Sequence, residues 1–187
     1  MQVQDAQREV RSVYLGGSVG QFVSGALWLA SAAIGTWGSR RSAILALVVG
    51  GMFIFPVTTL VLKAMGRRAA LSRENPLGAL ATQIAFTVPL SLPLVGAAAL
   101  HRIDWFYPAT MIVVGAHYLP FTFLYGMGLF AVLAGVLISG GLCLGLYLHA
   151  GFTAGGWGTG LALCLFAVVC LIVGRRDAGP EAAPGVR

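Results

Sequence analysis

The chain has 187 residues, of which 58% are hydrophobic and only 10% are charged, whereas about 25% of the residues in an ordinary soluble domain are charged. Its mean hydropathy of +0.86 excludes a water-soluble globular domain, because so apolar a chain needs lipid on its outside. The net charge of +6 does not predict nucleic-acid binding, because the basic residues stand in short breaks between apolar runs and form no patch with exposed aromatic residues.

The first half of the chain contains three apolar runs, each near the roughly 20 residues that a helix needs to cross a bilayer. A polar segment, residues 1–14, precedes the first run, residues 15–37. We expect this run to be a retained helix, because it is longer than the apolar core of a cleaved signal peptide. The second and third runs are residues 42–62 and 77–100, with a basic loop between them.

The second half is an almost chargeless stretch. The 70 residues from Trp105 to Gly174 contain no Asp, Glu, Lys or Arg. Two helices would greatly overshoot the bilayer here, and four would leave no room for turns. Glycine-rich breaks divide the stretch into three runs, near residues 105–125, 129–148 and 158–173. Residues 15–174 are therefore predicted to form one transmembrane domain, followed by a short polar tail, 175–187.

The distribution of basic residues predicts the orientation of these helices. Cytoplasmic loops carry an excess of Lys and Arg. With both termini in the cytoplasm, nine basic residues lie inside and three, Arg40, Arg41 and Arg102, lie outside. The inside residues are Arg8, Arg11, Lys63, Arg67, Arg68, Arg73, Arg175, Arg176 and Arg187. The sequence thus predicts an all-α, polytopic membrane protein with six transmembrane helices, N-in and C-in, surrounded by the lipid bilayer.

Prolines and glycines predict local features of the bundle. Pro89 and Pro93 in the third run and Pro120 in the fourth remove backbone hydrogen bonds, which predicts kinked third and fourth helices, and Pro56 does the same in the second run. Small residues four apart allow helices to approach closely. Such pairs favour packing within the chain, and a homodimer face is the alternative; they are Gly16/Gly20, Gly141/Gly145, Gly151/Gly155 and Gly156/Gly160.

One set of polar residues is placed at similar depth by the predicted topology. Polar groups inside a membrane are costly, so each of them suggests a role. Gln21 and Gln83 lie in the inner halves of the first and third helices, and His117 lies near mid-membrane. We expect these side chains to form a ligand-binding cluster, whose full set is Gln21, Gln83, His117, Tyr118, Tyr125 and Glu74. The alternative is that each side chain only holds helices together.

A second set of residues lies at the predicted outer surface. His101 and Asp104 are three residues apart, and His149 begins another outer loop. These three groups form a possible zinc site only if the loops come together. A simpler interpretation pairs Arg102 with Asp104 at the membrane surface. The sequence predicts no cofactor and no nucleic-acid partner.

The segment Ser72-Arg73-Glu74-Asn75-Pro76 stands directly before the third apolar run. Ser and Asn side chains commonly accept hydrogen bonds from the first backbone amides of a helix, and Glu74 would lie near the positive end of the helix dipole. The motif therefore predicts a cap on the third helix by Ser72 or Asn75.

Three segments carry a resemblance to known proteins: Tyr14-Leu15-Gly16-Gly17-Ser18-Val19-Gly20-Gln21, Arg73-Glu74-Asn75-Pro76-Leu77-Gly78 and Asp104-Trp105-Phe106-Tyr107-Pro108. In these segments the chain resembles a group of small bacterial multi-pass membrane proteins of unknown function. The resemblance implies a protein of the bacterial inner membrane, and it implies no activity.

Three functions fit these features. The first is binding or transport of a small or lipophilic molecule through the polar cluster. The second is an intramembrane enzyme acting on a lipid or isoprenoid, with His117 and Glu74 as acid or base, or with a metal held by His101, Asp104 and His149. The third is a structural or regulatory subunit without a site.

Overall fold

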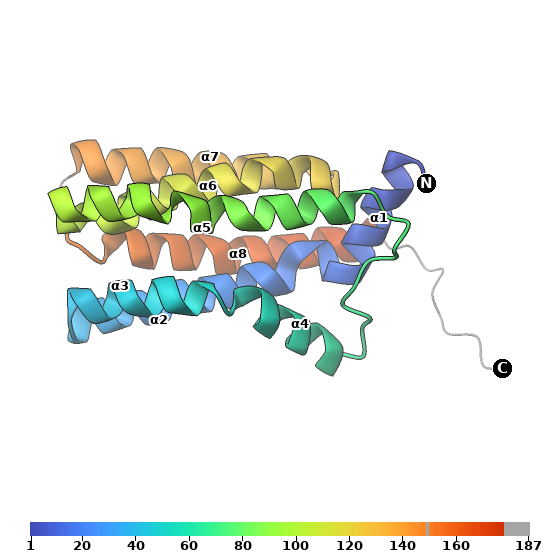
Figure 1. The fold of residues 1–187 in the computed structure, drawn as a ribbon, viewed down its shortest axis with the longest axis horizontal. Coiled ribbons are helices and arrows are strands. Elements are labelled where there is room, and N and C mark those ends of the chain that lie inside the picture. Colours follow the sequence, from blue (N-terminus) through green and yellow to red (C-terminus); the bar gives the residue numbers. More distant parts are fainter. Residues whose placement is uncertain (149, 178–187) are drawn as a thin grey trace.

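The computed structural model describes residues 1–148 and 150–177, and these residues form helices and short connections without any strand. The long helices lie side by side along one axis, with α1 and the end of α8 at the same end of the bundle (Figure 1). The elements are α1 Val3–Tyr14, η1 Leu15–Gly17, α2 Ser18–Trp37, α3 Arg40–Gly51, α4 Ile54–Ala64, α5 Leu77–His101, η2 Ile103–Trp105, α6 Phe106–Tyr125, α7 Leu129–Leu142, the π-helical turn η3 Cys143–Tyr147, and α8 Ala154–Asp177.

Several of these helices are long and apolar enough to cross a membrane. Four segments within the described residues meet this condition, and α3 with α4 would be a fifth if the bent pair is one span. The four are Val3–Trp37, Leu77–His101, Leu129–Tyr147 and Ala154–Gly174. The 20-residue helix α6 is not among them, and it is the helix with the most buried residues of its length. Because its neighbours cover it, α6 can carry polar and aromatic side chains that a lipid-facing helix would not.

The sharpest bend in the spanning region lies between α3 and α4, whose axes differ by 56°. Gly50 and Gly51 precede the break at Met52 and Phe53, and a side chain at Gly50 would overlap Leu27 of α2. After this close approach, α4 turns away from the rest of the bundle (Figure 1). The break lies where the sequence indicated a helix breaker in the second run, because Pro56 leaves the Met52 carbonyl without its helical partner. By contrast, α5 and α6 remain continuous helices through their prolines.

Glycines bring two helix pairs into close contact, as their spacing predicted. On α7, a Cβ at Gly141 would lie 2.7 Å from the carbonyl oxygen of Pro108 on α6. On α2, a Cβ at Gly25 would lie 3.0 Å from the carbonyl oxygen of Gly160 on α8. These glycines therefore serve packing within the chain, because only a residue without a side chain allows the backbones so near.

A buried polar contact joins α2, α3 and α6. The Ser31 hydroxyl donates to the carbonyl oxygen of Ala43 at 2.8 Å, and it lies 2.6 Å from the Tyr107 hydroxyl. Ser31 and Tyr107 are both fully buried. Since the Ser31 proton is used for Ala43, the Tyr107 hydroxyl donates to Ser31, and all three groups are satisfied.

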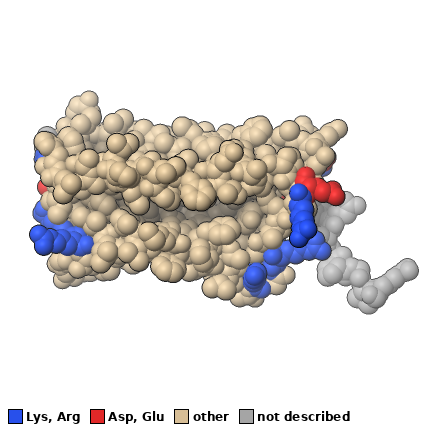
Figure 2. All heavy atoms as spheres, viewed as in Figure 1, with Lys and Arg blue, Asp and Glu red and all other residues tan. Residues whose placement is uncertain are grey.

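Charged side chains gather at the two ends of the bundle, and the middle of the visible face is free of them (Figure 2). Arg40 and Arg41 begin α3 at one end, whereas α1, the end of α4 and the loop 65–76 carry the basic residues of the other end. This separation matches an apolar belt between two aqueous surfaces.

Helix α1 is fastened to the end of the bundle. Gln7 donates to the Phe123 carbonyl at 2.6 Å, and the Arg11 guanidinium donates to the Tyr125 carbonyl. These donors satisfy carbonyls at the end of α6, where a cation is also favoured by the helix dipole. On its other side α1 presents Glu9, which accepts hydrogen bonds from Ser72 and Asn75 in the loop before α5.

Candidate functional site

A cavity of about 720 Å³ lies between two parts of the bundle. Helices α2, α3 and α4 form one wall, and α5 and α6 form the other, while residues of α1 and of the loop 69–71 line one end. Its lining is mostly apolar, and no Asp, Glu, Lys or Arg lines it among the described residues. A cavity of this size, with few polar groups, is typical of a small-molecule site.

The cavity reaches the outer surface of the bundle between α4 and α5. Met52 and Phe55 line it on one side, Ala85 and Pro89 line it on the other, and all four are exposed. Figure 2 shows a hollow along this face, bordered by uncharged atoms. The opening therefore lies at the height of the apolar belt and not at a charged end.

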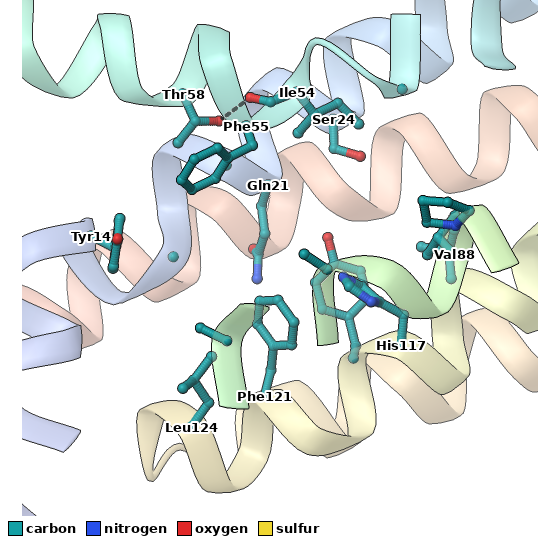
Figure 3. A pocket seen from close by; sticks show the side chains of 18 of the residues that line it. Tyr14, Gln21, Ser24, Ile54, Phe55, Thr58, Val88, His117, Phe121 and Leu124 are labelled. Atoms are coloured by element: carbon teal, nitrogen blue, oxygen red, sulfur yellow. Dashed lines mark hydrogen bonds between the residues drawn. The ribbon is translucent and has the colours of Figure 1, made fainter. Parts of the chain in front are cut away.

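Gln21 supplies a buried polar group from α2. Its side chain is only 2% exposed and extends into the cavity (Figure 3). The amide nitrogen makes one long contact, 3.8 Å to the Cys170 thiol of α8, and the amide oxygen has no hydrogen-bond partner in the protein. The oxygen is enclosed by protein atoms, so the amide nitrogen is the end that faces the cavity (Figure 3).

His117 enters the cavity from α6, opposite Gln21 (Figure 3). Its Nδ1 lies 2.8 Å from the Thr87 hydroxyl, and that hydroxyl donates to the Ile84 carbonyl at 2.7 Å. Because the Thr87 proton is used for Ile84, its oxygen accepts from Nδ1–H, which assigns the neutral ring proton to Nδ1. The imidazole Nε2 is then a hydrogen-bond acceptor.

Aromatic residues surround the inner end of the cavity. Tyr118 and Tyr125 are buried on α6, and both line the cavity with Phe121 and Phe130. Their rings are in mutual contact, with centroid distances from 4.9 Å for Tyr125–Phe130 to 6.0 Å for Tyr118–Phe130. This rigid wall supplies apolar area and two phenol hydroxyls.

The structure brings together four of the six residues predicted for the cluster, namely Gln21, His117, Tyr118 and Tyr125. Gln83 is exposed and does not line the cavity. On the same helix Thr82, Ala85 and Pro89 face the cavity, so the rotation of α5 turns Gln83 away. Glu74 is exposed in the loop before α5 and is also outside the cavity.

The outer residues do not form the arrangement that the sequence suggested. Asp104 pairs with Arg40 of α3 at 3.1 Å, which corrects the predicted pairing with Arg102; the Arg102 guanidinium lies over the Trp105 ring instead. His101 stacks near Trp105, and His149 lies outside the described residues. Within residues 1–148 and 150–177 no group of three His, Cys, Asp or Glu is arranged to hold a metal ion.

The cap predicted before the third helix is present. The Asn75 side-chain oxygen accepts a hydrogen bond from the backbone nitrogen of Leu77 at 2.9 Å, at the start of α5. Ser72 takes no part in this cap, because its backbone nitrogen and hydroxyl both donate to Glu9 of α1. The role of Glu9 was not predicted, because a lone carboxylate near the N-terminus carries no signal for a distant partner.

Sequence reasoning also missed other side chains of the cavity, among them Tyr14, Thr58 and Phe121. A signal for Phe121 exists on α6, where cavity residues recur at helical spacing: Thr110, Val114, His117, Phe121 and Leu124. Tyr14 and Thr58 offer no comparable signal, because their positions depend on the bend at Gly50–Phe53 and on the turn at η1.

Comparison with known proteins bears on the fold as a whole. The model of a family of unknown function (DUF7010) matches residues 3–173. The chain belongs to that family. No curated protein and no solved structure matches the chain. Family membership confirms that the chain is one of an uncharacterised group. The matched range includes all the residues that line the cavity.

Proposed function

We propose that this protein is a six-span, N-in and C-in protein of the bacterial inner membrane that binds or transports a small lipophilic molecule through the cavity between α2–α4 and α5–α6. One observation carries the proposal: an apolar cavity of about 720 Å³, open on the apolar face of the bundle, is lined by the uncharged polar side chains of Gln21 and His117. An orienting polar group within an apolar volume is what an amphiphilic ligand requires.

The proposed six spans are the four long apolar segments, the bent pair α3 and α4 counted as one span, and α6. All basic residues assigned to the cytoplasm within residues 1–148 lie at one end of the bundle, and those assigned to the outside lie at the other. Reporters fused after residues 38, 70, 102, 127, 151 and 187 test this. Alternating locations with a cytoplasmic C-terminus are expected, and an external C-terminus would overturn the topology.

The opening between α4 and α5 would admit a ligand from the bilayer. Phe55 is 65% exposed and Met52 is 68% exposed at this rim, which is suited to contact with acyl chains and not with water. A lipophilic molecule already dissolved in the membrane would reach Gln21 without crossing a charged surface. The bend of α4 away from the bundle leaves this path open.

The geometry supports ligand binding better than it supports an enzyme that uses His117 and Glu74 as acid and base. His117 lies in the cavity, but Glu74 is exposed in the loop before α5, and no other carboxylate among the described residues lines the cavity. A general acid or base acts within hydrogen-bond reach of its substrate and is tuned by a neighbouring group. His117 instead holds Thr87, which fixes its ring in one orientation.

Trp28 offers an internal probe of ligand binding, because it is buried and lines the cavity. In a variant with Trp37→Phe, Trp105→Phe and Trp157→Phe, a long-chain molecule brominated on its chain should quench Trp28 in a saturable manner. Ala85→Phe narrows the opening and should abolish saturation while leaving helicity unchanged. Quenching that rises linearly with probe concentration, or that is unaffected by Ala85→Phe, would overturn the proposed function.

A further inference from the structure

The polar groups of the cavity restrict the chemistry of its ligand, and this argument rests on the proposed function. The described residues that line the cavity include no cationic and no anionic side chain. A carboxylate, phosphate or ammonium group would therefore be buried there without an opposite charge, which is strongly unfavourable. A ligand whose polar group is neutral meets no such penalty.

The two polar groups that meet at mid-cavity are a hydrogen-bond donor and an acceptor. The Gln21 amide oxygen has almost no accessible surface, whereas its amide nitrogen, which makes only a 3.8 Å contact to Cys170, extends into the cavity (Figure 3). His117 donates through Nδ1 toward Thr87, and this leaves Nε2 as an acceptor. A donor and an acceptor on opposite walls select a ligand whose polar group can both accept and donate.

A hydroxyl group is the neutral donor that fits this site best. It donates one hydrogen bond to Nε2 of His117, and its oxygen accepts from the Gln21 amide nitrogen on the opposite wall or from the phenol hydroxyls of Tyr118 and Tyr125, which line the same cavity. An ether or ester lacks the donor. An alkane has neither donor nor acceptor, and it would leave Gln21 without a partner.

The remainder of the cavity fits a hydrocarbon chain. Ile54 and Phe55 of α4 face Val88 and Leu92 of α5 across it, and the cavity opens between these two helices. A chain attached to the hydroxyl group would extend from Gln21 through this opening into the bilayer, which removes the need for the cavity to enclose the whole molecule. Because the bilayer interior is as apolar as these walls, packing against the chain supplies van der Waals contacts and adds little hydrophobic free energy.

We propose that the ligand is a neutral lipid alcohol, an acyl or isoprenoid chain with a free hydroxyl group, held by Gln21 and His117 and admitted sideways between α4 and α5. His117 determines the specificity for the hydroxyl group by accepting its proton, Gln21 donates to the hydroxyl oxygen, and the apolar walls bind the chain.

A matched series of probes tests this proposal through Trp28 quenching. The probes share one brominated chain and end in a hydroxyl, a methyl ether, a carboxylate or a primary ammonium group, and the concentration of each is expressed per detergent molecule. We expect the alcohol to bind about tenfold more tightly than the ether, as the loss of one buried hydrogen bond implies, and the two charged probes to bind more weakly still.

His117→Ala supplies the control for the donated hydrogen bond. This variant should reduce alcohol affinity to that of the ether and should leave ether affinity unchanged, which also shows that the cavity is intact. Gln21→Leu should weaken the alcohol and the ether alike, because both ligand oxygens accept from the Gln21 amide. Equal affinities across the series, or an alcohol preference that survives His117→Ala, would overturn the proposed ligand class and leave lipophile binding in place. If none of the probes saturates, the proposed function itself fails.

Discussion

The Nδ1 atom of His117 on α6 lies 2.8 Å from the hydroxyl oxygen of Thr87 on α5, and this hydrogen bond sets the orientation of the imidazole ring. The two helices are also joined by apolar contacts, but this contact alone decides which ring nitrogen faces the cavity. The tautomer that follows from it places an acceptor where the proposed ligand needs one.

Removing the Thr87 hydroxyl should therefore affect both stability and the ring. Thr87→Val keeps the shape of the side chain and leaves Nδ1 without its partner, which should cost about 1–2 kcal/mol in free energy of unfolding. The ¹⁵N chemical shifts of the His117 ring should show a mixture of tautomers. Ser91→Ala is the matched control, because the Ser91 hydroxyl bonds only within α5; an unchanged ring spectrum in Thr87→Val would contradict the assignment.

Two glycines of α7 differ in what a side chain would meet. A Cβ at Gly141 would lie 2.7 Å from the Pro108 carbonyl oxygen, whereas Gly135 faces open space. Gly141→Ala should lower the free energy of unfolding by about 1–3 kcal/mol, because α6 and α7 must separate. Gly135→Ala should raise it by up to about 1 kcal/mol through helix propensity. Thermal unfolding in detergent measures both, and equal effects would rule out the close approach of α6 and α7.

The hydrogen bonds of Ser31 predict which of two substitutions lowers the free energy of unfolding more. Tyr107→Phe removes one hydrogen bond and leaves Ser31 bonded to Ala43, at a cost of about 0.5–1.5 kcal/mol. Ser31→Ala removes both bonds and leaves a buried Tyr107 hydroxyl without a partner, at a cost of about 2–3 kcal/mol. Denaturation midpoints in the reverse order would show that Ser31 does not link the three helices.

Glu9 should control how firmly the loop before α5 is held. Its carboxylate accepts from the Ser72 nitrogen at 2.6 Å and from the Asn75 amide at 2.8 Å. Glu9→Ala releases both groups, and trypsin should then cleave after Arg73 about fivefold faster, since cleavage follows local opening. Asp5→Ala is the control, because it removes only the exposed pair with Arg8, which is worth little. Equal cleavage rates in the two variants would contradict the fastening role of Glu9.

The helical class, the apolar segments and the Asn75 cap were accessible from the sequence, because each depends on residues close together in the chain. Hydrophobic length predicts where a segment can span, and the Asn75 side chain caps a helix that begins two residues later. Membrane depth, likewise, was enough to suggest that Gln21 and His117 meet.

Depth alone could not predict the rotation of each helix, and for this reason Gln83 was placed in the cluster although it faces away from the cavity. A step of one residue turns a side chain by about 100°, and with apolar residues all around α5 no stripe reveals its inner face. The bend after Gly51 was accessible in part, because Pro56 leaves the Met52 carbonyl without its helical partner. The close contact of Leu27 of α2 with Gly50 was not accessible, because it joins residues that are distant in the chain.

The position of a bound lipid alcohol tests the central claim most directly. A long-chain alcohol with a photoreactive diazirine on its chain would be activated with the protein in bilayers, and the labelled peptides identified by mass spectrometry. Labels concentrated on α4 and α5 at the cavity, displaced by unlabelled alcohol and lost in Gln21→Leu, are the expected result. Labels spread evenly over the exposed faces of α7 and α8 and insensitive to competition would contradict a specific site in this cavity.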